Sequence, residues 1–116
     1  MAKKMSSKKS AARARVAVLL GSESDLPVIE KMKPLLELFG LPYRIDVASA
    51  HRMPARLSRI VKTAEKEGVE VFVAVAGMAA HLPGVVASMT GKPVIGVPVA
   101  SGPLAGVDAL LSIVQM

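Results

Sequence analysis

Four short apolar runs at regular intervals place the strongest constraint on the fold of this chain. They are "VAVLL" (16–20), "YRIDVA" (43–48), "VFVAVA" (71–76) and "PVIGVPV" (93–99). Valine-rich runs of this length, bounded by glycine, proline or polar residues, are typical of β-strands. The third run is apolar throughout, which predicts a central strand that is buried on both faces.

The segments between these runs carry apolar residues at helical spacing. The first segment has two capping candidates, Ser24 and Asp25, and stops at Gly40. The second opens at Pro54, which suits the first turn of a helix, and stops at Gly68. The expected helices span residues 24–40, 54–68 and 106–116, and a further helix starts at about Ala79 or Pro83 and ends at Met89.

Alternating strands and helices at this spacing form right-handed βαβ units around a parallel sheet. The sequence therefore predicts an α/β fold, a three-layer, doubly wound parallel sheet with flavodoxin-like strand order 2-1-3-4. A chain of 116 residues is long enough for one such domain, which we expect to span residues 16–116.

The positive charge is concentrated in the opening "MAKKMSSKKSAARAR" (1–15). This segment carries six basic residues and no acid, whereas the rest of the chain holds nine of each sign. A nucleic-acid-binding domain would have a basic face within its fold, so we expect no nucleic-acid partner. We interpret 1–15 as a disordered basic tail rather than a binding arm. Its lack of acids is also compatible with an organellar targeting peptide.

The composition limits the partners and the compartment. Apolar residues make up 52% of the chain, a high fraction for a small domain, which predicts that other subunits cover some apolar surface. The absence of cysteine excludes disulfides and thiolate chemistry and is compatible with a reducing cytoplasm. No apolar run reaches the roughly 18 residues of a membrane span. We expect a cytoplasmic homo-oligomer with no membrane partner.

Three loops that follow the first three strands contain both histidines of the chain. They are "GSESD" (21–25), "SAHRMP" (49–54) and "AGMAAHLPG" (76–84). In a doubly wound sheet, ligands bind outside the carboxyl ends of the strands, at the point where the strand order reverses. The predicted strand order brings these loops to that edge, so we expect them to form one site.

The first loop has the residue types of a phosphate site. Gly21 permits a tight turn, Ser22 and Ser24 offer hydroxyls, and a following helix offers free backbone N–H groups. No Gly-Lys-Ser/Thr follows, so this is not a Walker loop. Asp25 would repel a phosphate and fits better as a cap or as an acceptor for sugar hydroxyls. Taken alone, the loop is better explained by plain helix capping.

The other two loops add a cation and proton-transfer groups. Arg52 could pair with a phosphate, and His51 could give and take a proton. Gly77 and Ala79 would let a flat ligand approach the backbone closely. For His81 three interpretations stay open: lining the site, orienting the loop or contacting a neighbouring subunit. No ligand spacing supports a metal site, and we expect no metal and no cofactor.

The residues in these loops resemble those of the PurE family of purine biosynthesis. The matching segments are "GSESDLPV", "VASAHRMP", "AGMAAHLPGVVASMTGKPVIGVPV" and "LAGVDALLSIVQM", within residues 16–116. The resemblance implies a homo-octameric enzyme that acts on an aminoimidazole ribonucleotide without ATP, metal or cofactor. "AAHLPG" is similar to the mutase branch, which moves a carboxylate from the exocyclic nitrogen of N5-carboxyaminoimidazole ribonucleotide to C4.

Other functions stay open beside the mutase. One is a carboxylase that uses CO2 directly, and another is a non-catalytic module that binds a phosphosugar. A carboxylase branch linked to the nickel-pincer cofactor is similar in part but lacks the "AAHLPG" pattern. A protein that the basic tail recruits to nucleic acid is the least favoured alternative.

The resemblance also implies residue roles. His51 would be the general acid and base, and the ribose phosphate part would be bound by Ser22, Asp25 and Arg52. The supporting and wall-forming residues would be Ser24, Ser49, Ala50, Gly77, Met78, Ala79, His81 and Leu82. The chain departs from the family in two places. Family members usually have glycine where this chain has Met78, and they usually continue past "QM" into a C-terminal helix that we expect this chain to lack.

Overall fold

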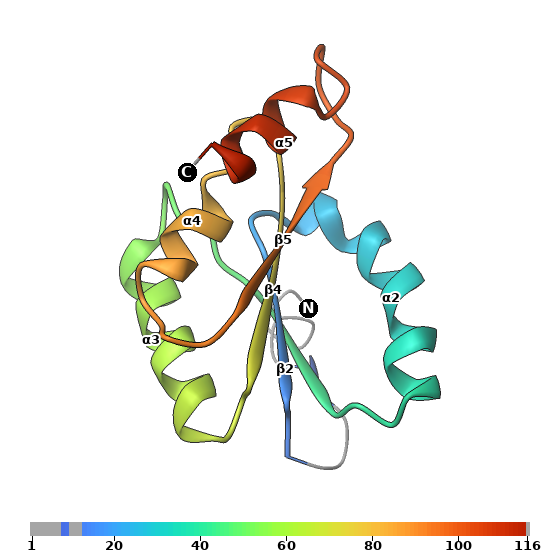
Figure 1. Ribbon diagram of the computed structural model, residues 1–116, viewed down its shortest axis with the longest axis vertical. Coiled ribbons are helices and arrows are strands. Elements are labelled where there is room, and N and C mark those ends of the chain that lie inside the picture. The colour runs from blue at the N-terminus through green and yellow to red at the C-terminus, as the bar shows by residue number, and fades with distance from the viewer. Residues whose placement is uncertain (1–7, 10–12, 116) are drawn as a thin grey trace.

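A five-stranded sheet forms the centre of the protein, as the computed structural model of residues 8–9 and 13–115 shows (Figure 1). The strands are β1 (Lys8–Lys9), β2 (Val16–Leu20), β3 (Tyr43–Val47), β4 (Val71–Gly77) and β5 (Val94–Val99). Strands β2 to β5 are parallel and lie in the order β3-β2-β4-β5. This order confirms the predicted 2-1-3-4 topology, with the apolar strand β4 in an interior position.

Short helices connect the strands. They are the 3-10 turn η1 (Glu23–Asp25) and the α-helices α2 (Leu26–Leu38), α3 (Pro54–Lys66), α4 (Leu82–Ala87) and α5 (Val107–Val114). The expected helix 24–40 is divided because Ser22 caps a 3-10 turn before α2 starts. Of the two starts expected for the helix that ends near Met89, the one at Pro83 is within one residue of the observed start, because Pro83 occupies the first turn of α4. Residue 116 of the last expected helix lies outside the described residues.

The segment predicted to be a basic tail contributes described residues to the sheet region. Strand β1 pairs antiparallel with β3, which was not expected from its two lysines. Ala14 is buried in the core, and Arg15 forms an ion pair of 2.8 Å with Glu70. The Nε–H of Arg13 donates a hydrogen bond to the carbonyl of Glu67. Residues 1–7 and 10–12 of the predicted tail lie outside the described residues.

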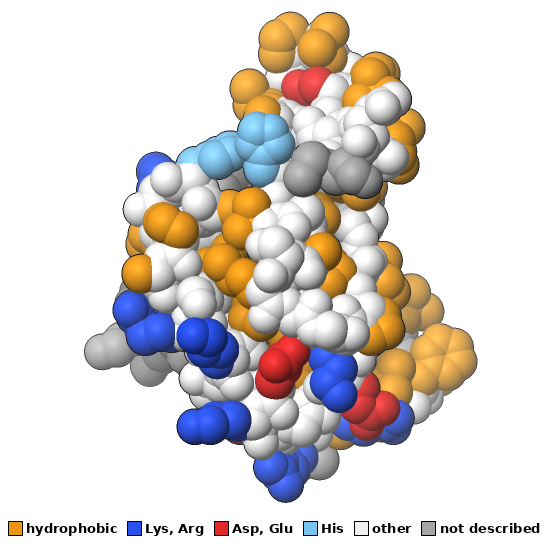
Figure 2. All heavy atoms as spheres, turned by 60° about the vertical axis from the view of Figure 1, so that its left-hand side comes forward, with side chains coloured by type: hydrophobic (Ala, Val, Ile, Leu, Met, Phe, Trp, Pro, Cys, Tyr) orange, Lys and Arg blue, Asp and Glu red, His pale blue; other side chains and the backbone are white. Residues whose placement is uncertain are grey.

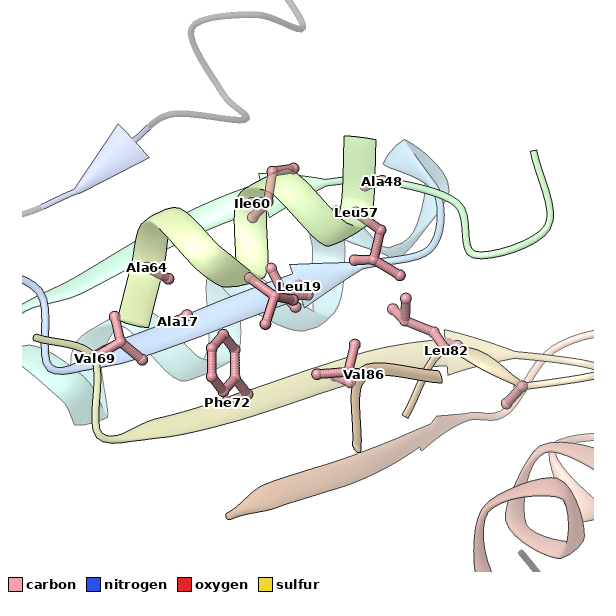
Figure 3. Close-up of a cluster of buried hydrophobic side chains, with 14 of the residues drawn as sticks. Ala17, Leu19, Ala48, Leu57, Ile60, Ala64, Val69, Phe72, Leu82 and Val86 are labelled. Carbon is pink, nitrogen blue, oxygen red and sulfur yellow. The ribbon is translucent and has the colours of Figure 1, made fainter. Parts of the chain in front are cut away.

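The two faces of the sheet bury separate cores. On one face, α3, α4 and α5 pack through Leu57, Val86 and Ala109 around Phe72 of β4. Figure 3 shows Leu57 directed toward Leu19 of β2, and Phe72 on β4 beneath them. On the other face, α2 packs against the valines and leucines of β2 and β4. Helices therefore cover both sides of the sheet and give the three layers that the sequence predicts (Figure 1).

None of the helices among the described residues is long and apolar enough to cross a membrane. The longest are α2 and α3, and each of them ends after 13 residues.

We expect Phe72→Ala to lower the free energy of unfolding by about 3–5 kcal/mol, because removal of a fully buried ring leaves a cavity. Urea denaturation measures this loss. Phe39→Ala is the matched control, since the Phe39 side chain is 70% exposed and its removal should change stability by less than about 0.5 kcal/mol. Equal losses for the two variants would contradict the core described above.

Candidate active site

A cavity of about 300 Å3 lies outside the carboxyl ends of β2 and β4, where the strand order reverses. The predicted site residues that line it are Ser22, Ser24, Asp25, Ser49, Ala50, His51, Gly77, Met78, Ala79, His81 and Leu82. Gly21, Ala76 and Ser101 complete the lining. The structure thus brings the three loops together, as expected from the strand order.

The loop after β2 is held by hydrogen bonds within itself and to β4. The N–H of Gly21 donates to the carbonyl of Val75 at 3.1 Å, which continues the sheet ladder into the loop. Ser22 caps η1, because its Oγ accepts hydrogen bonds from the N–H of Ser24 at 3.2 Å and from the Ser24 hydroxyl at 3.0 Å. Capping therefore explains the orientation of both serines, and their hydroxyls lie at the cavity wall.

Asp25 differs from these serines. It stands at the N-cap position of α2, yet its side chain makes no capping hydrogen bond. Its side chain is buried, and burial raises the pKa of this carboxyl group, although a hydrogen bond with the backbone of Ser22 partly opposes the shift. A buried carboxylate that lines a cavity and caps no helix is well suited to accept hydrogen bonds from ligand hydroxyls.

The loop after β3 contributes a buried serine and an exposed histidine. The Oγ of Ser49 accepts a hydrogen bond from the N–H of Arg52 at 3.1 Å, so Ser49 holds the turn that leads into α3. Arg52 is exposed and does not line the cavity, in contrast to the other predicted site residues. Arg52 belongs to a loop whose residues Ser49 to His51 line the cavity. The sequence pattern did not reveal that the Arg52 side chain lies outside that lining.

The two histidines form a hydrogen-bonded pair. Nε2 of His51 lies 2.7 Å from Nδ1 of His81, and the rings meet edge to face at an interplanar angle of 87°. Figure 2 shows the two imidazoles against each other at the surface. One ring must supply the N–H and the other the lone pair, so the tautomers of the two side chains are coupled. Both rings also line the cavity, so the pair lies within reach of a ligand bound there.

The loop after β5 also reaches the cavity, which the sequence analysis missed. A methyl group on Gly77 would lie 2.5 Å from the Oγ of Ser101, so a side chain at this position would displace the Ser101 hydroxyl. The position of this loop in the sequence could have indicated it, because residues 100–106 follow a strand at the same edge of the sheet as the three predicted loops. Ser101 therefore adds a hydroxyl that faces the loop carrying His81.

Metal-ligating residues do not cluster within the part of the chain that the structure describes. No group of three or more histidine, cysteine, aspartate or glutamate side chains is arranged to hold an ion there. The paired nitrogens of His51 and His81 bond to each other instead.

Fold and site together define a class: a doubly wound α/β protein with a polar crevice and a histidine pair at the switch point of its sheet. The chain belongs to the AIR carboxylase family, whose model matches residues 15–116. This match confirms the family relationship that the loop motifs indicated.

Relatives with assigned functions match the same part of the chain. It is 55% identical over 101 residues to the N5-carboxyaminoimidazole ribonucleotide mutase of Pyrococcus horikoshii, covering 87% of this chain and 57% of that protein. The mutase of Thermotoga maritima is also 55% identical, with 88% and 60% covered. The phosphoribosylaminoimidazole carboxylase of Saccharomyces cerevisiae is 52% identical over 101 residues, with 87% and 18% covered. The chain thus spans about three fifths of the length of these two mutases.

A solved structure has the same fold. The crystal structure of Treponema denticola PurE superimposes with a TM-score of 0.80 at 30% sequence identity, covering 87% of this chain and 64% of the other. The agreement extends the family relationship from the sequence to the arrangement of the sheet and its flanking helices.

We expect Asp25→Asn to stabilise the protein at pH 7. Burial raises the pKa of Asp25 in the folded state, so its contribution to stability is present below the ordinary pKa of about 4 and is lost as pH rises through the higher folded-state pKa. The variant should therefore be more stable than the unmodified protein at pH 7 and equal to it in acid. Urea denaturation at several pH values measures the difference.

The control for this prediction is Glu23→Gln, which removes an exposed carboxylate from the same loop. It should leave the stability nearly unchanged at pH 7. An Asp25→Asn variant that is no more stable than the unmodified protein at that pH would show that burial does not disfavour the carboxylate.

Proposed function

We propose that the chain is an N5-carboxyaminoimidazole ribonucleotide mutase, an isomerase of purine biosynthesis. The observation that carries this proposal is the hydrogen-bonded His51–His81 pair at the edge of a cavity lined by hydroxyls and a buried carboxylate. Two mutases at 55% identity support the choice of reaction. The absence of cysteine is compatible with action in the cytoplasm.

The polar residues of the loop after β2 suit the ribose phosphate part of the substrate. Ser22 and Ser24 offer hydroxyls and Asp25 offers a buried acceptor for the ribose hydroxyls. Ser49 lies beside them, and Arg52 follows in the same turn. Arg52 would meet the phosphate outside the cavity, where an exposed guanidinium can form a bidentate pair.

The imidazole would lie between the two histidine-bearing loops. Gly77, Ala79 and Ala50 present little side-chain bulk, so a planar ring can approach the backbone. Leu82 supplies a buried apolar contact on the same wall. A cavity of about 300 Å3 can hold the ring together with a released CO2, which makes recapture of the CO2 intramolecular.

His51 would move the one proton that the reaction transfers. The N–C bond of the carbamate breaks, CO2 leaves, and protonated His51 gives its proton to the exocyclic nitrogen. C4 then attacks the retained CO2, and His51 takes the proton that C4 loses. The proton balance closes with His51 in its starting state. His81 holds Nε2 of His51 and thereby orients the ring during both steps.

Direct carboxylation is the second candidate. The yeast relative at 52% identity is named a phosphoribosylaminoimidazole carboxylase, and the same cavity could hold CO2 drawn from solution. A phosphosugar-binding domain without catalytic activity is the third, since the hydroxyls and the carboxylate of the β2 loop could bind such a ligand without any proton transfer. Turnover of the carbamate substrate, compared with turnover of the unmodified ribonucleotide plus bicarbonate, separates the three.

We also propose that the chain forms a homo-oligomer, with an octamer as the expected state. Apolar side chains are exposed around α5, at the upper end of the molecule in Figures 1 and 2. They are Leu104, Val107, Leu110, Leu111 and Val114. A patch of this kind is unusual on a monomer and suits a second copy of the chain.

For His51→Asn we expect turnover of N5-carboxyaminoimidazole ribonucleotide to fall by about 10²- to 10⁴-fold, because the variant lacks the group that transfers the proton. Binding of the ribonucleotide should change by no more than a few fold. A discontinuous turnover assay and calorimetric titration measure the two quantities.

His81→Asn is the matched comparison, since His81 is the only other histidine in the chain. It should retain more activity than His51→Asn, because His81 orients the reacting ring without exchanging a proton with the substrate. Unchanged turnover in His51→Asn would remove His51 from its assigned role. A greater loss in His81→Asn would reverse the two roles.

We expect light scattering after size-exclusion chromatography to give a mass several times that of one chain. Replacing Leu110 and Leu111 with glutamate should lower this mass, because charges would be buried at the proposed contact. Thr63→Glu, on the exposed side of α3, should leave it unchanged. A single-chain mass for the unmodified protein at tens of micromolar would contradict the proposal.

A further inference from the structure

Met78 combines two features that are unfavourable on their own. It follows the last residue of β4 with a backbone φ of +53°, in the left-handed region that side chains with a Cβ disfavour. Its side chain is also 52% exposed although it is apolar. A strained residue at a cavity wall persists only where its surroundings hold it in place, and such residues are concentrated at functional sites.

The Met78 side chain lies across the backbone of the loop between β5 and α5. A Cβ on Gly102 would lie 3.2 Å from the Cγ of Met78 and 3.5 Å from its Sδ and Cε. The preceding residue, Gly77, makes the equivalent close approach to the Oγ of Ser101. Two successive residues at the end of β4 therefore contact two successive residues of the neighbouring loop.

The loop that Met78 contacts, residues 100–106, closes on itself, since a Cβ on Gly106 would lie 2.9 Å from the Cα of Ala100. Gly102, Ala105 and Gly106 all have positive φ values, and the hydrogen bonds from Ala105 to Gly102 and from Val107 to Leu104 are local. Residues 102–105 are exposed. Met78 and its neighbour Gly77 therefore connect this loop to the end of β4 beside the cavity.

We propose that Met78 is a positioning residue for the ligand. The left-handed backbone aims its side chain at Gly102, and this contact holds the 100–106 loop so that Ser101 stays on the cavity wall. Met78 and Ser101 both line the cavity, together with the serines of the β2 loop. This role for Met78 rests on the proposed ribonucleotide site. It adds a fourth loop to that site, residues 100–106, and makes Met78 the residue that holds this loop in place.

Met78→Gly separates positioning from plain structural support. Glycine adopts this φ without strain, so we expect the melting temperature to rise by about 3 °C. The side-chain contact is lost, so we expect the dissociation constant of 4-carboxy-5-aminoimidazole ribonucleotide to rise about five- to tenfold. Met78→Leu keeps an apolar side chain over Gly102 and should bind within about twofold of the unmodified protein. Thermal melting and calorimetric titration measure the two quantities.

Ala105→Gly is the matched control. Ala105 has a φ of +51°, so glycine relieves the same kind of strain within the loop, but Ala105 does not line the cavity. We expect its melting temperature to rise and its affinity to stay within about twofold. An equal loss of affinity in this variant would assign the effect to loop flexibility and overturn the role of Met78.

A double-mutant cycle tests whether Met78 acts through Ser101. Ser101→Ala should raise the dissociation constant about threefold in the unmodified protein and have little effect in Met78→Gly, since the hydroxyl is then already displaced. Additive effects would overturn the coupling. If the unmodified protein does not bind the ribonucleotide, the proposed function fails. If it binds and Met78→Gly binds equally well, only the positioning role fails.

Discussion

The parallel pairing of β2 with β4 is the constraint on which the rest of the structure depends. Its register aligns Leu20, the last residue of β2, with Val75, and β4 ends two residues further on at Gly77. The ladder continues one step further, where the N–H of Gly21 donates to Val75. On the other side, the N–H of Ala48 donates to the carbonyl of Leu20 at 2.9 Å. Three loops therefore leave the sheet side by side, and the cavity forms between them.

The same pairing explains the histidine pair. His51 and His81 are thirty positions apart and belong to loops that follow different strands. Their nitrogens reach hydrogen-bonding distance because β3 and β4 flank β2 and end at one edge. Once joined, the rings constrain each other's tautomers, so a side chain that would otherwise be an exposed loop residue acquires a fixed orientation. A packed sheet thus supplies the preorganisation on which the proposed proton transfer would depend.

Much of the fold could be predicted from the sequence because buried strands require apolar runs, and each run marks one strand of the parallel sheet. Strand β1 could not, since two lysines carry no apolar pattern and pair only because β3 is exposed at the sheet edge. The strand order predicted the position of the site, and the histidines, serines and Asp25 showed which three loops form it. Ser101 was missed because its loop lacks such residues, and the exposure of Arg52 depends on a turn that its own N–H closes with Ser49.

The cavity wall contains residues that a stable domain would avoid. Asp25 is a buried carboxylate without a capping bond, and Met78 has a left-handed backbone. Both stand just beyond strands whose side chains, such as Leu19 and Phe72, are fully buried. The core can therefore offset local losses at the rim without a change in fold. Because both residues are unfavourable for folding and line the cavity, they fit the ligand-binding role proposed for this cavity better than a role in folding.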